Sequence, residues 1–179
     1  MTKNRQTKAV PVAALAGNPN VGKSTIFNAL TGMRQHTGNW PGKTVALAQG
    51  MCSYKGEEIR LVDLPGTYAL VSKSQEETLA AGFISGGEAD CVIAVCDATS
   101  LERSLILALQ VMELTDRVFV CVNLMDEAQK QGIEIDLAAL SFELGVPVVA
   151  ASASREEGMG ELLEQLRRIL DGFEAPRPR

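Results

Sequence analysis

The sequence predicts a doubly wound α/β domain with a six-stranded, mostly parallel sheet and one antiparallel strand at the sheet edge. Apolar runs typical of strands alternate with segments of helical periodicity, and this alternation favours parallel strands joined by right-handed crossovers. Several of the runs are apolar throughout, as strands buried on both faces are. A glycine-rich loop of the phosphate-binding type follows the first run, and in such sheets ligands bind beyond the carboxyl ends of the strands.

The phosphate-binding pattern Gly-x-x-x-x-Gly-Lys-[Ser/Thr] occurs between a predicted strand over 9–16 and a predicted helix over 23–30. Its backbone N–H groups would surround a phosphate at the start of the helix, where the helix dipole favours negative charge. We expect Gly22 to let the backbone approach the ligand, Lys23 to reach the β- and γ-phosphates, and the Ser24 hydroxyl to hold Mg²⁺. The residues of this phosphate loop are Gly17, Asn18, Pro19, Asn20, Val21, Gly22, Lys23, Ser24 and Thr25.

The remaining elements follow in the order that a doubly wound sheet requires. The first helix ends at Thr31-Gly32, and residues 33–43 show no periodicity, so we expect a functional or mobile loop there. Two strands then form a hairpin around the polar turn 54–56. The later strands coincide with continuous apolar runs, and the later helices with apolar residues at helical spacing. The predicted strands after the first span 44–53, 57–62, 90–96, 117–122 and 146–150, and the later helices end near 85 or span 101–114, 136–144 and about 160–170.

Three further polar motifs follow strands of the predicted sheet. In Asp63-Leu64-Pro65-Gly66 the carboxylate can hold Mg²⁺ through water and the glycine N–H can face a γ-phosphate. Asn123 and Asp126 form a base-reading pattern, because a carboxylate accepts two hydrogen bonds from guanine, a donor pair that adenine lacks. Ser152-Ala153 would offer a backbone N–H to the base oxygen. Each motif is weak alone, but their order and their placement after separate strands indicate a GTPase.

Composition and charge argue against several other classes. The 179 residues, 46% of them hydrophobic and 22% charged, suit one soluble α/β domain. The net charge of −5 argues against nucleic acid as an obligatory partner. The four cysteines lack metal-ligand spacing and are expected to be reduced and buried, as in a cytosolic protein. No apolar run approaches the roughly 18 residues of a membrane helix, and no signal peptide opens the chain.

Three stretches of the chain resemble the translation-factor-related GTPases and, within them, the GTPase domain of the ferrous iron transport protein B family. They are residues 17–25, Thr-Gly-Asn-Trp-Pro-Gly-Lys-Thr-Val at 37–45, and Leu-Val-Asp-Leu-Pro-Gly-Thr-Tyr at 61–68; residues 97–103 also resemble that family. The resemblance covers about residues 9–170 and implies the Ras-like form of the P-loop NTPase fold. It also implies that Thr44 completes the Mg²⁺ shell in the triphosphate state, that Gly42 and Lys43 adjoin the nucleotide, and that residues 67 to about 80 form a second switch.

Two positions depart from the pattern that related GTPases share. Leu124 stands where the common Asn-Lys-x-Asp signature has lysine, so the lysine stem that usually covers the base is missing. We therefore expect modest nucleotide affinity. Thr67 follows Gly66 where Ras-like GTPases have the glutamine that orients the attacking water, so another group must support hydrolysis.

A potassium ion is expected to support hydrolysis in the absence of this glutamine. Resemblance to potassium-activated GTPases, which carry Asn at the position of Asn20, suggests K⁺ beside the phosphates, with backbone carbonyls of Gly38 and Trp40 completing its shell. A fixed cation there would offset charge that develops on the leaving oxygens, giving slow, K⁺-stimulated hydrolysis. Two alternatives stay open: Asn20 as a local cap of its loop, and Trp40 as a core anchor rather than an exposed switch residue. The residues expected to act in catalysis are Asn20, Lys23, Thr44 and Gly66.

The resemblance implies a domain that binds and hydrolyses GTP and regulates Fe²⁺ uptake by a transporter of the inner membrane. We divide the chain into an N-terminal tail (1–8), a GTP-binding domain (9–171) and the start of a linker (172–179). The family continues into a helical regulatory domain and a membrane-spanning Fe²⁺ permease region, so we expect this chain to be the cytoplasmic part of a longer protein. The oligomeric state stays open. The alternatives are a ribosome-assembly or RNA-modification GTPase, which would add a basic RNA-binding domain, and a nucleotide-binding scaffold that hydrolyses nothing.

Overall fold

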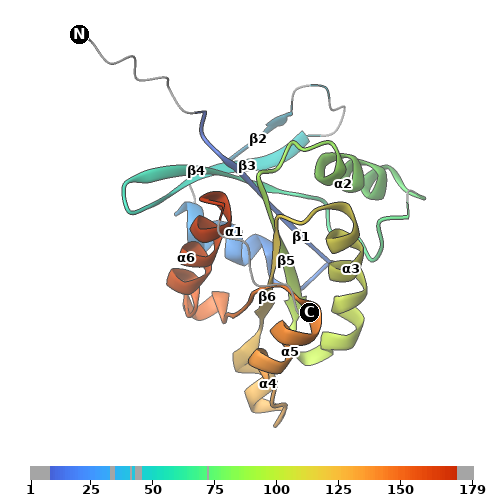
Figure 1. The fold of residues 1–179 in the computed structure, drawn as a ribbon, viewed down its shortest axis with the longest axis vertical. Helices are drawn as coiled ribbons and strands as arrows, with labels where there is room; N and C mark the ends of the chain where they lie inside the picture. The colour runs from blue at the N-terminus through green and yellow to red at the C-terminus, as the bar shows by residue number, and fades with distance from the viewer. Residues whose placement is uncertain (1–8, 33–34, 41, 43–45, 72, 173–179) are drawn as a thin grey trace.

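A seven-stranded sheet runs through the domain, and helices cover both of its faces (Figure 1). The computed structural model describes residues 9–32, 35–40, 42, 46–71 and 73–172. The strands are β1 (Val12–Gly17), β2 (Gln35–Asn39), β3 (Ala46–Tyr54), β4 (Glu57–Asp63), β5 (Cys91–Asp97), β6 (Val118–Asn123) and β7 (Val148–Ala150). The helices are α1 (Lys23–Thr31), α2 (Gln75–Ser85), α3 (Leu101–Leu114), α4 (Met125–Lys130), α5 (Leu137–Leu144) and α6 (Met159–Leu170), with 3₁₀ turns η1 (Ala98–Ser100) and η2 (Ala153–Arg155).

The predicted doubly wound, mostly parallel sheet is confirmed. The strand order is β2-β3-β4-β1-β5-β6-β7, and the strands from β4 to β7 are mutually parallel. The register places Leu15 opposite Asp63 on β4, and Asp97 opposite Asn123 on β6. The carboxyl ends of these strands therefore lie level with one another, and the loops that follow them start from one edge.

The sheet has seven strands, one more than the six that the sequence predicts. The sequence predicts a loop at 33–43, whereas the structure places β2 there, paired antiparallel with β3 from Gln35 opposite Gly50 to Asn39 opposite Ala46. The β2 sequence, Gln-His-Thr-Gly-Asn, has no apolar alternation, so pairing with β3 rather than burial of a hydrophobic face accounts for the strand. The antiparallel strand β3 consequently lies one place inside the sheet edge.

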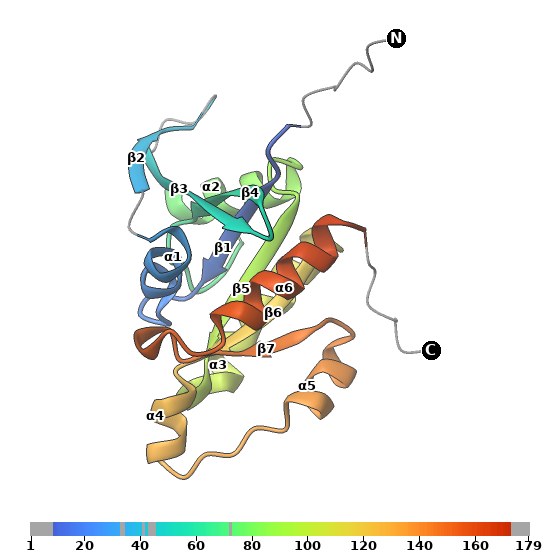
Figure 2. The ribbon, with the colours of Figure 1, turned by 90° about the vertical axis from the view of Figure 1, so that its left-hand side faces the viewer.

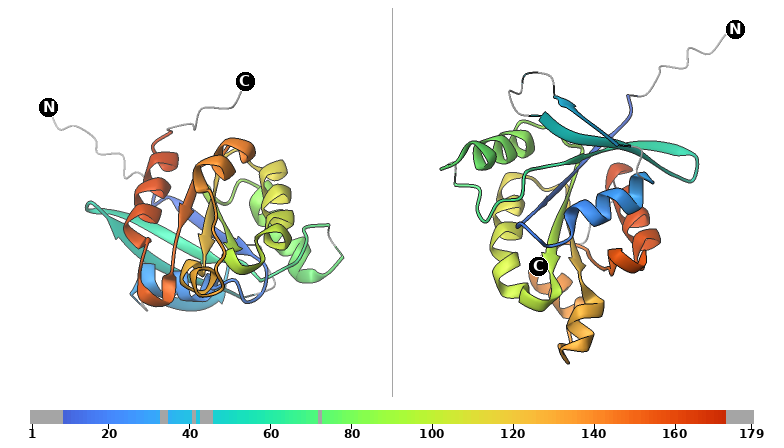
Figure 3. Two further views of the ribbon diagram at one scale, coloured as in Figure 1. Left: turned by 90° about the horizontal axis from the view of Figure 1, so that it is seen from below. Right: turned by 180° about the vertical axis from the view of Figure 1, so that it is seen from behind.

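One layer of helices packs on each face of the sheet. α1 and α6 lie in front of the sheet in Figure 2, and the right panel of Figure 3 shows α2 and α3 on the opposite side. Along β5, alternate residues from Cys91 to Val95 enter the core cluster with α1 and α6, and those from Val92 to Cys96 enter the cluster with α2 and α3. All of these side chains are at most 2% exposed, which explains the unbroken apolar run in the sequence.

The short helix α4 is absent from the elements that the sequence predicts. Its six residues are too few to show helical periodicity. Leu124, which precedes it, adopts a left-handed conformation with φ of 63°. This turns the chain so that the backbone N–H groups of Glu127 and Ala128 donate to the Leu124 carbonyl at 3.1 and 3.0 Å. A local backbone conformation, rather than an apolar stripe, therefore starts the helix.

The four cysteines are free and buried, as predicted. Burial raises the pKa of the Cys52 thiol to about 11 and that of the Cys96 thiol to about 12. Because the thiolate is the form that binds metals and attacks disulfides, these protonated thiols act as small apolar side chains in the core.

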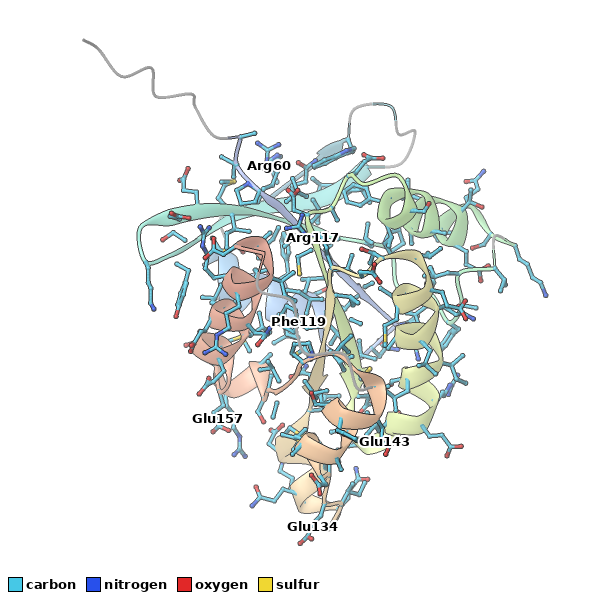
Figure 4. All side chains as sticks on the ribbon, viewed as in Figure 1. Arg60, Arg117, Phe119, Glu134, Glu143 and Glu157 are labelled. Atoms are coloured by element: carbon cyan, nitrogen blue, oxygen red, sulfur yellow. The ribbon has the colours of Figure 1, made fainter. Side chains whose placement is uncertain are left out.

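Phe119→Ala should lower the free energy of unfolding by about 3–5 kcal/mol, because it removes a buried aromatic ring and leaves a cavity. Phe119 is 0% exposed and packs between β6 and the α1–α6 layer, where it is labelled in Figure 4. Urea denaturation measures the change. Phe142 on α5 is 68% exposed, so Phe142→Ala is the matched control, with an expected change within about 0.5 kcal/mol. Equal losses in the two variants would contradict this assignment of the core.

Candidate nucleotide-binding site

Four loops meet at the carboxyl edge of the parallel strands. This edge points downward in Figure 1 and faces the viewer in the left panel of Figure 3. The loops follow β1, β4, β6 and β7, and they carry the four polar motifs singled out in the sequence. The structure thus brings together residues from four separate parts of the chain, as expected for a ligand site in a doubly wound sheet.

The phosphate loop joins β1 to the first turn of α1. Gly22 caps the helix with φ of 88°, and a Cβ atom at this position would overlap the side-chain nitrogen of Asn123. Only glycine combines this conformation with such a close approach. Ser24 and Thr25 lie exposed in the first turn of α1, where backbone N–H groups lack helical partners and the helix dipole favours an anion. The start of α1 therefore has the donors that a phosphate group needs.

Lys23 and Asp63 form an ion pair at the phosphate end of the site. The Lys23 Nζ atom lies 2.9 Å from Asp63 Oδ1, and the two side chains are 9% and 14% exposed. The pair joins the phosphate loop to the end of β4, so the expected phosphate-binding lysine and the expected metal-associated carboxylate are neighbours. A phosphate group and its Mg²⁺ would compete with this contact for each partner.

The segment after β4 packs directly against the phosphate loop. A Cβ atom on Gly66 would lie 3.2 Å from the Pro19 backbone, so glycine allows the close approach. The Thr67 N–H donates to the Gly17 carbonyl at 3.3 Å, and the Thr67 side chain is 6% exposed. Thr67, at the position of the missing glutamine, thus buries its side chain in the protein and does not replace the group that orients water.

Asn123 connects the phosphate loop to the loop after β7. Its Nδ2 donates to the Val21 carbonyl at 3.0 Å, and its Oδ1 accepts from the Ala153 N–H at 3.0 Å. Its side chain is buried, with 1% exposure. The Ala153 N–H, expected to face a base oxygen, therefore donates within the protein. Asn123 thus holds two loops in register, a role that the base-reading pattern alone does not reveal.

The Asp126 carboxylate has two oxygens in different surroundings. Its Oδ1 is buried without a hydrogen-bond partner among the described residues, whereas its Oδ2 lies 3.4 Å from the Arg155 Nε. The Asp126 backbone is fixed, since its N–H donates to the Ser152 hydroxyl at 3.1 Å. A buried acceptor without a partner is unfavourable, so Oδ1 is a prepared position for a ligand donor. Sequence reasoning missed Arg155, because nothing in its local sequence pairs it with Asp126.

Gly38 and Trp40, which belong with Thr44 to the expected first switch, lie at the sheet edge and against the helix layer respectively. Trp40 is half-buried, with its ring 5.1 Å from the Phe83 ring of α2 in an edge-to-face arrangement, which agrees with its interpretation as a core anchor. Gly38 on β2 pairs with Leu47 on β3. The strand β2 lies three places from β1 in the sheet, or about 14 Å at the usual strand spacing. The structure therefore does not bring Gly38 next to Asn20 of the phosphate loop. Gly42 is exposed with φ of 78°, and Lys43 and Thr44 lie outside the described residues.

The second-switch segment is attached to α3 at two points. The guanidinium of Arg103 lies 4.9 Å from the centre of the Tyr68 ring, and the Leu70 N–H donates to Gln110 Oε1 at 2.6 Å. These contacts hold the chain that leaves the phosphate site against the helix that follows β5.

Within the described part of the chain, no group of three or more His, Cys, Asp or Glu residues is arranged to hold a metal ion. No helix there is long and apolar enough to cross a membrane.

Strand order, phosphate loop and the three loops beside it define a P-loop domain of the GTPase class. The sequence model of the family described as ferrous iron transport protein B matches residues 11–166. The chain belongs to this family.

Curated relatives agree with this membership. The chain is 44% identical over 165 residues to the Fe(2+) transporter FeoB of Escherichia coli K12, and equally to that of Salmonella typhimurium LT2. In both cases the match covers 90% of this chain but only 21% of the relative, so the chain spans about a fifth of the length of these transporters.

Solved structures of relatives share the fold. The G domain of the T. maritima FeoB iron transporter superposes with a TM-score of 0.82 at 44% identity, covering 89% of this chain and 98% of that one. The FeoB G domain of Methanococcus jannaschii gives 0.80 at 42% identity, with 90% and 98% coverage. The T. maritima cytosolic domain in its GDP form I gives 0.88 at 42% identity, covering 94% of this chain and 66% of that one.

Asn123→Ala should lower the free energy of unfolding by about 1–3 kcal/mol, because the Val21 carbonyl and the Ala153 N–H lose a buried partner. Chemical denaturation measures the loss. Asn28→Ala on α1 is the control, since the Asn28 Oδ1 has no hydrogen-bond partner in the part of the chain that the structure describes, and the stability of this variant should not fall. An Asn123→Ala protein as stable as the parent would show that the bridge between the loops contributes little.

Proposed function

We propose that this domain binds guanine nucleotides and hydrolyses GTP to GDP and phosphate. The observation that carries the proposal is the Asp126 carboxylate, which is 8% exposed and keeps a buried oxygen without a partner in the described structure. A ligand that donates to this oxygen removes the cost of leaving it unpaired. Relatives support the same function, since the T. maritima FeoB cytosolic domain is described in GDP and GMPPNP forms.

Guanine fits this carboxylate better than adenine does. Guanine presents N1–H and the exocyclic amine side by side, and a carboxylate can accept both, whereas adenine has no such donor pair. Asn123 contributes indirectly, because it holds the loop that bears the phosphate donors at a fixed place beside the Asp126 loop. Leu124 carries no polar group that reaches over the base, so base recognition depends on Asp126.

The phosphate end of the site suits a triphosphate with Mg²⁺. The Ser24 hydroxyl and Asp63, acting through water, would hold the ion together with Thr44, an all-oxygen donor set of the kind Mg²⁺ requires. Mg²⁺ bound there supplies positive charge to the β- and γ-phosphates. Lys23 adds a second positive charge at the same place, and the Gly66 N–H faces the γ-phosphate.

Potassium would supply the positive charge that an arginine finger supplies in other GTPases. Asn20 is exposed in the phosphate loop with φ of 66°, so its side-chain oxygen is free to bind a cation. The carbonyls of Gly38 and Trp40 would complete the shell only after β2 and its flanking loop move toward the phosphate loop. Binding of K⁺ and of the triphosphate would thus depend on the same movement of β2.

At the level of the whole protein, this domain would regulate Fe²⁺ uptake from the cytoplasmic side of the inner membrane. The chain corresponds to about a fifth of the Fe(2+) transporters it resembles, which leaves room for a helical regulatory domain and a membrane-spanning permease region. An RNA-modification or ribosome-assembly role is less well supported, because the chain carries a net charge of −5. Measurement of phosphate release from GTP distinguishes a GTPase from a scaffold that binds the nucleotide without hydrolysing it.

Asp126→Asn should weaken GDP binding about 10- to 100-fold and favour xanthine nucleotides, because the amide donates to the C2 carbonyl of xanthine and opposes the guanine donors. Calorimetric titration with GDP and xanthosine diphosphate measures both effects. Glu127→Gln is the matched control, since Glu127 pairs with Lys130 at 2.7 Å on the surface of α4. Unchanged GDP affinity in Asp126→Asn would remove Asp126 from the base site.

GTP hydrolysis should be at least about tenfold faster in KCl than in NaCl at equal ionic strength, because a bound cation that lowers the barrier by about 1.4 kcal/mol gives this factor. Asn20→Ala should abolish the difference while leaving nucleotide binding largely intact, and Asn28→Ala should preserve it. Phosphate release under single-turnover conditions is the measurement. Equal rates of the parent protein in the two salts would refute the potassium site.

A further inference from the structure

Arg155 is the one charged side chain that the structure places against the Asp126 carboxylate within the described residues. The Arg155 Nε lies 3.4 Å from Oδ2, while Oδ1 has no hydrogen-bond partner among the described residues. The pair differs from the surface pairs Lys130–Glu127 and Arg168–Glu164, in which both side chains are at least 46% exposed. Here the arginine is 52% exposed but its partner is 8% exposed, so the contact reaches from solvent into the buried base site.

The loop that carries Arg155 is closed by its own backbone. The Ser152 N–H donates to the Glu157 carbonyl at 3.0 Å, and the Glu157 N–H donates back at 3.2 Å. Within this closed loop the Arg155 N–H donates to the Ser152 carbonyl at 2.9 Å. Because the Ser152 hydroxyl also accepts from the Asp126 N–H at 3.1 Å, the backbone positions of Arg155 and Asp126 are fixed relative to each other. The ion pair is therefore a product of the fold rather than a chance meeting of two surface side chains.

We propose that Arg155 is a specificity-determining residue, which competes with the exocyclic amine of guanine for Asp126 Oδ2. This inference rests on the proposed base site. Guanine offers two donors to Asp126 and needs both carboxylate oxygens, one of which Arg155 contacts. Hypoxanthine lacks the amine and offers only N1–H. Oδ1 can accept this single donor without help from Oδ2. Arg155 therefore weakens guanine binding more than hypoxanthine binding. It lowers the factor by which the site prefers guanine over hypoxanthine.

The effect of Arg155 on base recognition is larger because Leu124 leaves the base without a covering lysine stem. In a site without a lysine stem over the base, the carboxylate contributes most of the base recognition, so a cation on one of its oxygens has a large relative effect. A domain with such a counter-ion would release its guanine nucleotide more readily, since Arg155 can replace the leaving amine at Oδ2.

Arg155→Ala tests the proposal through the ratio of the dissociation constants of inosine diphosphate and GDP. A general loss of structure does not change this ratio. The dissociation constants of GDP and inosine diphosphate are measured by calorimetry, and the inosine-to-guanosine ratio is compared between proteins. The ratio should rise about two- to fivefold in Arg155→Ala, as expected for removal of a half-exposed ion pair, mainly through tighter GDP binding. Arg155→Lys, which keeps the charge, should stay closer to the parent ratio. Arg168→Ala, which removes an arginine from the exposed pair on α6, should match the parent.

Two results would overturn the proposal, and only the second would also remove the proposed base site. An unchanged or lower ratio in Arg155→Ala, with Asp126→Asn still impaired in GDP binding, would show that Arg155 does not compete with guanine although Asp126 reads the base. An Asp126→Asn protein that binds GDP as the parent does would remove the base site itself, and the proposal about Arg155 with it.

Discussion

One buried amide holds the nucleotide site together. Asn123 bonds to the phosphate loop through Val21 and to the loop after β7 through Ala153, while its position at the end of β6 ties both to the sheet. Its contact with Gly22 leaves no space for a side chain there. Asn123, with 1% exposure, thus links the loop of the phosphate donors to the loop beside the base acceptor. A nucleotide requires both ends of the site at a fixed separation, so recognition of phosphate and of base depend on the same contact.

The charges of the site are paired within the protein. Lys23 pairs with Asp63 at the phosphate end, and Arg155 pairs with Asp126 at the base end. Buried or half-buried charges are stable only when compensated, and both pairs use the side chains that a nucleotide would contact. Ligand binding is therefore an exchange of ionic partners, and its net free energy is smaller than the sum of the new contacts. We therefore expect selective binding of modest affinity.

The parallel core and the four motif loops could be predicted from the sequence because they depend on local signals. Apolar runs define strands such as β5, and glycine at Gly22 and Gly66 marks the close backbone approaches. β2 could not be predicted, since its polar residues form a strand only through pairing with β3. The Arg155–Asp126 pair joins residues 29 positions apart through the closure of one loop, and Trp40 packs on Phe83 through the tertiary fold. The Trp40–Phe83 contact thus joins the first switch to the helix α2, and neither it nor the ion pair leaves a periodic or motif signal in the sequence.

Guanine recognition by Asp126 is the central claim, and calorimetric titration of the unaltered domain with GDP and with ADP in the presence of Mg²⁺ tests it most directly. The two ligands share their phosphates and ribose, so they differ only in the base that meets Asp126. The structure predicts saturable binding of GDP at one site and binding of ADP at least about 100-fold weaker, as expected when a buried carboxylate faces a base without the donor pair. Equal affinities for GDP and ADP would contradict the account.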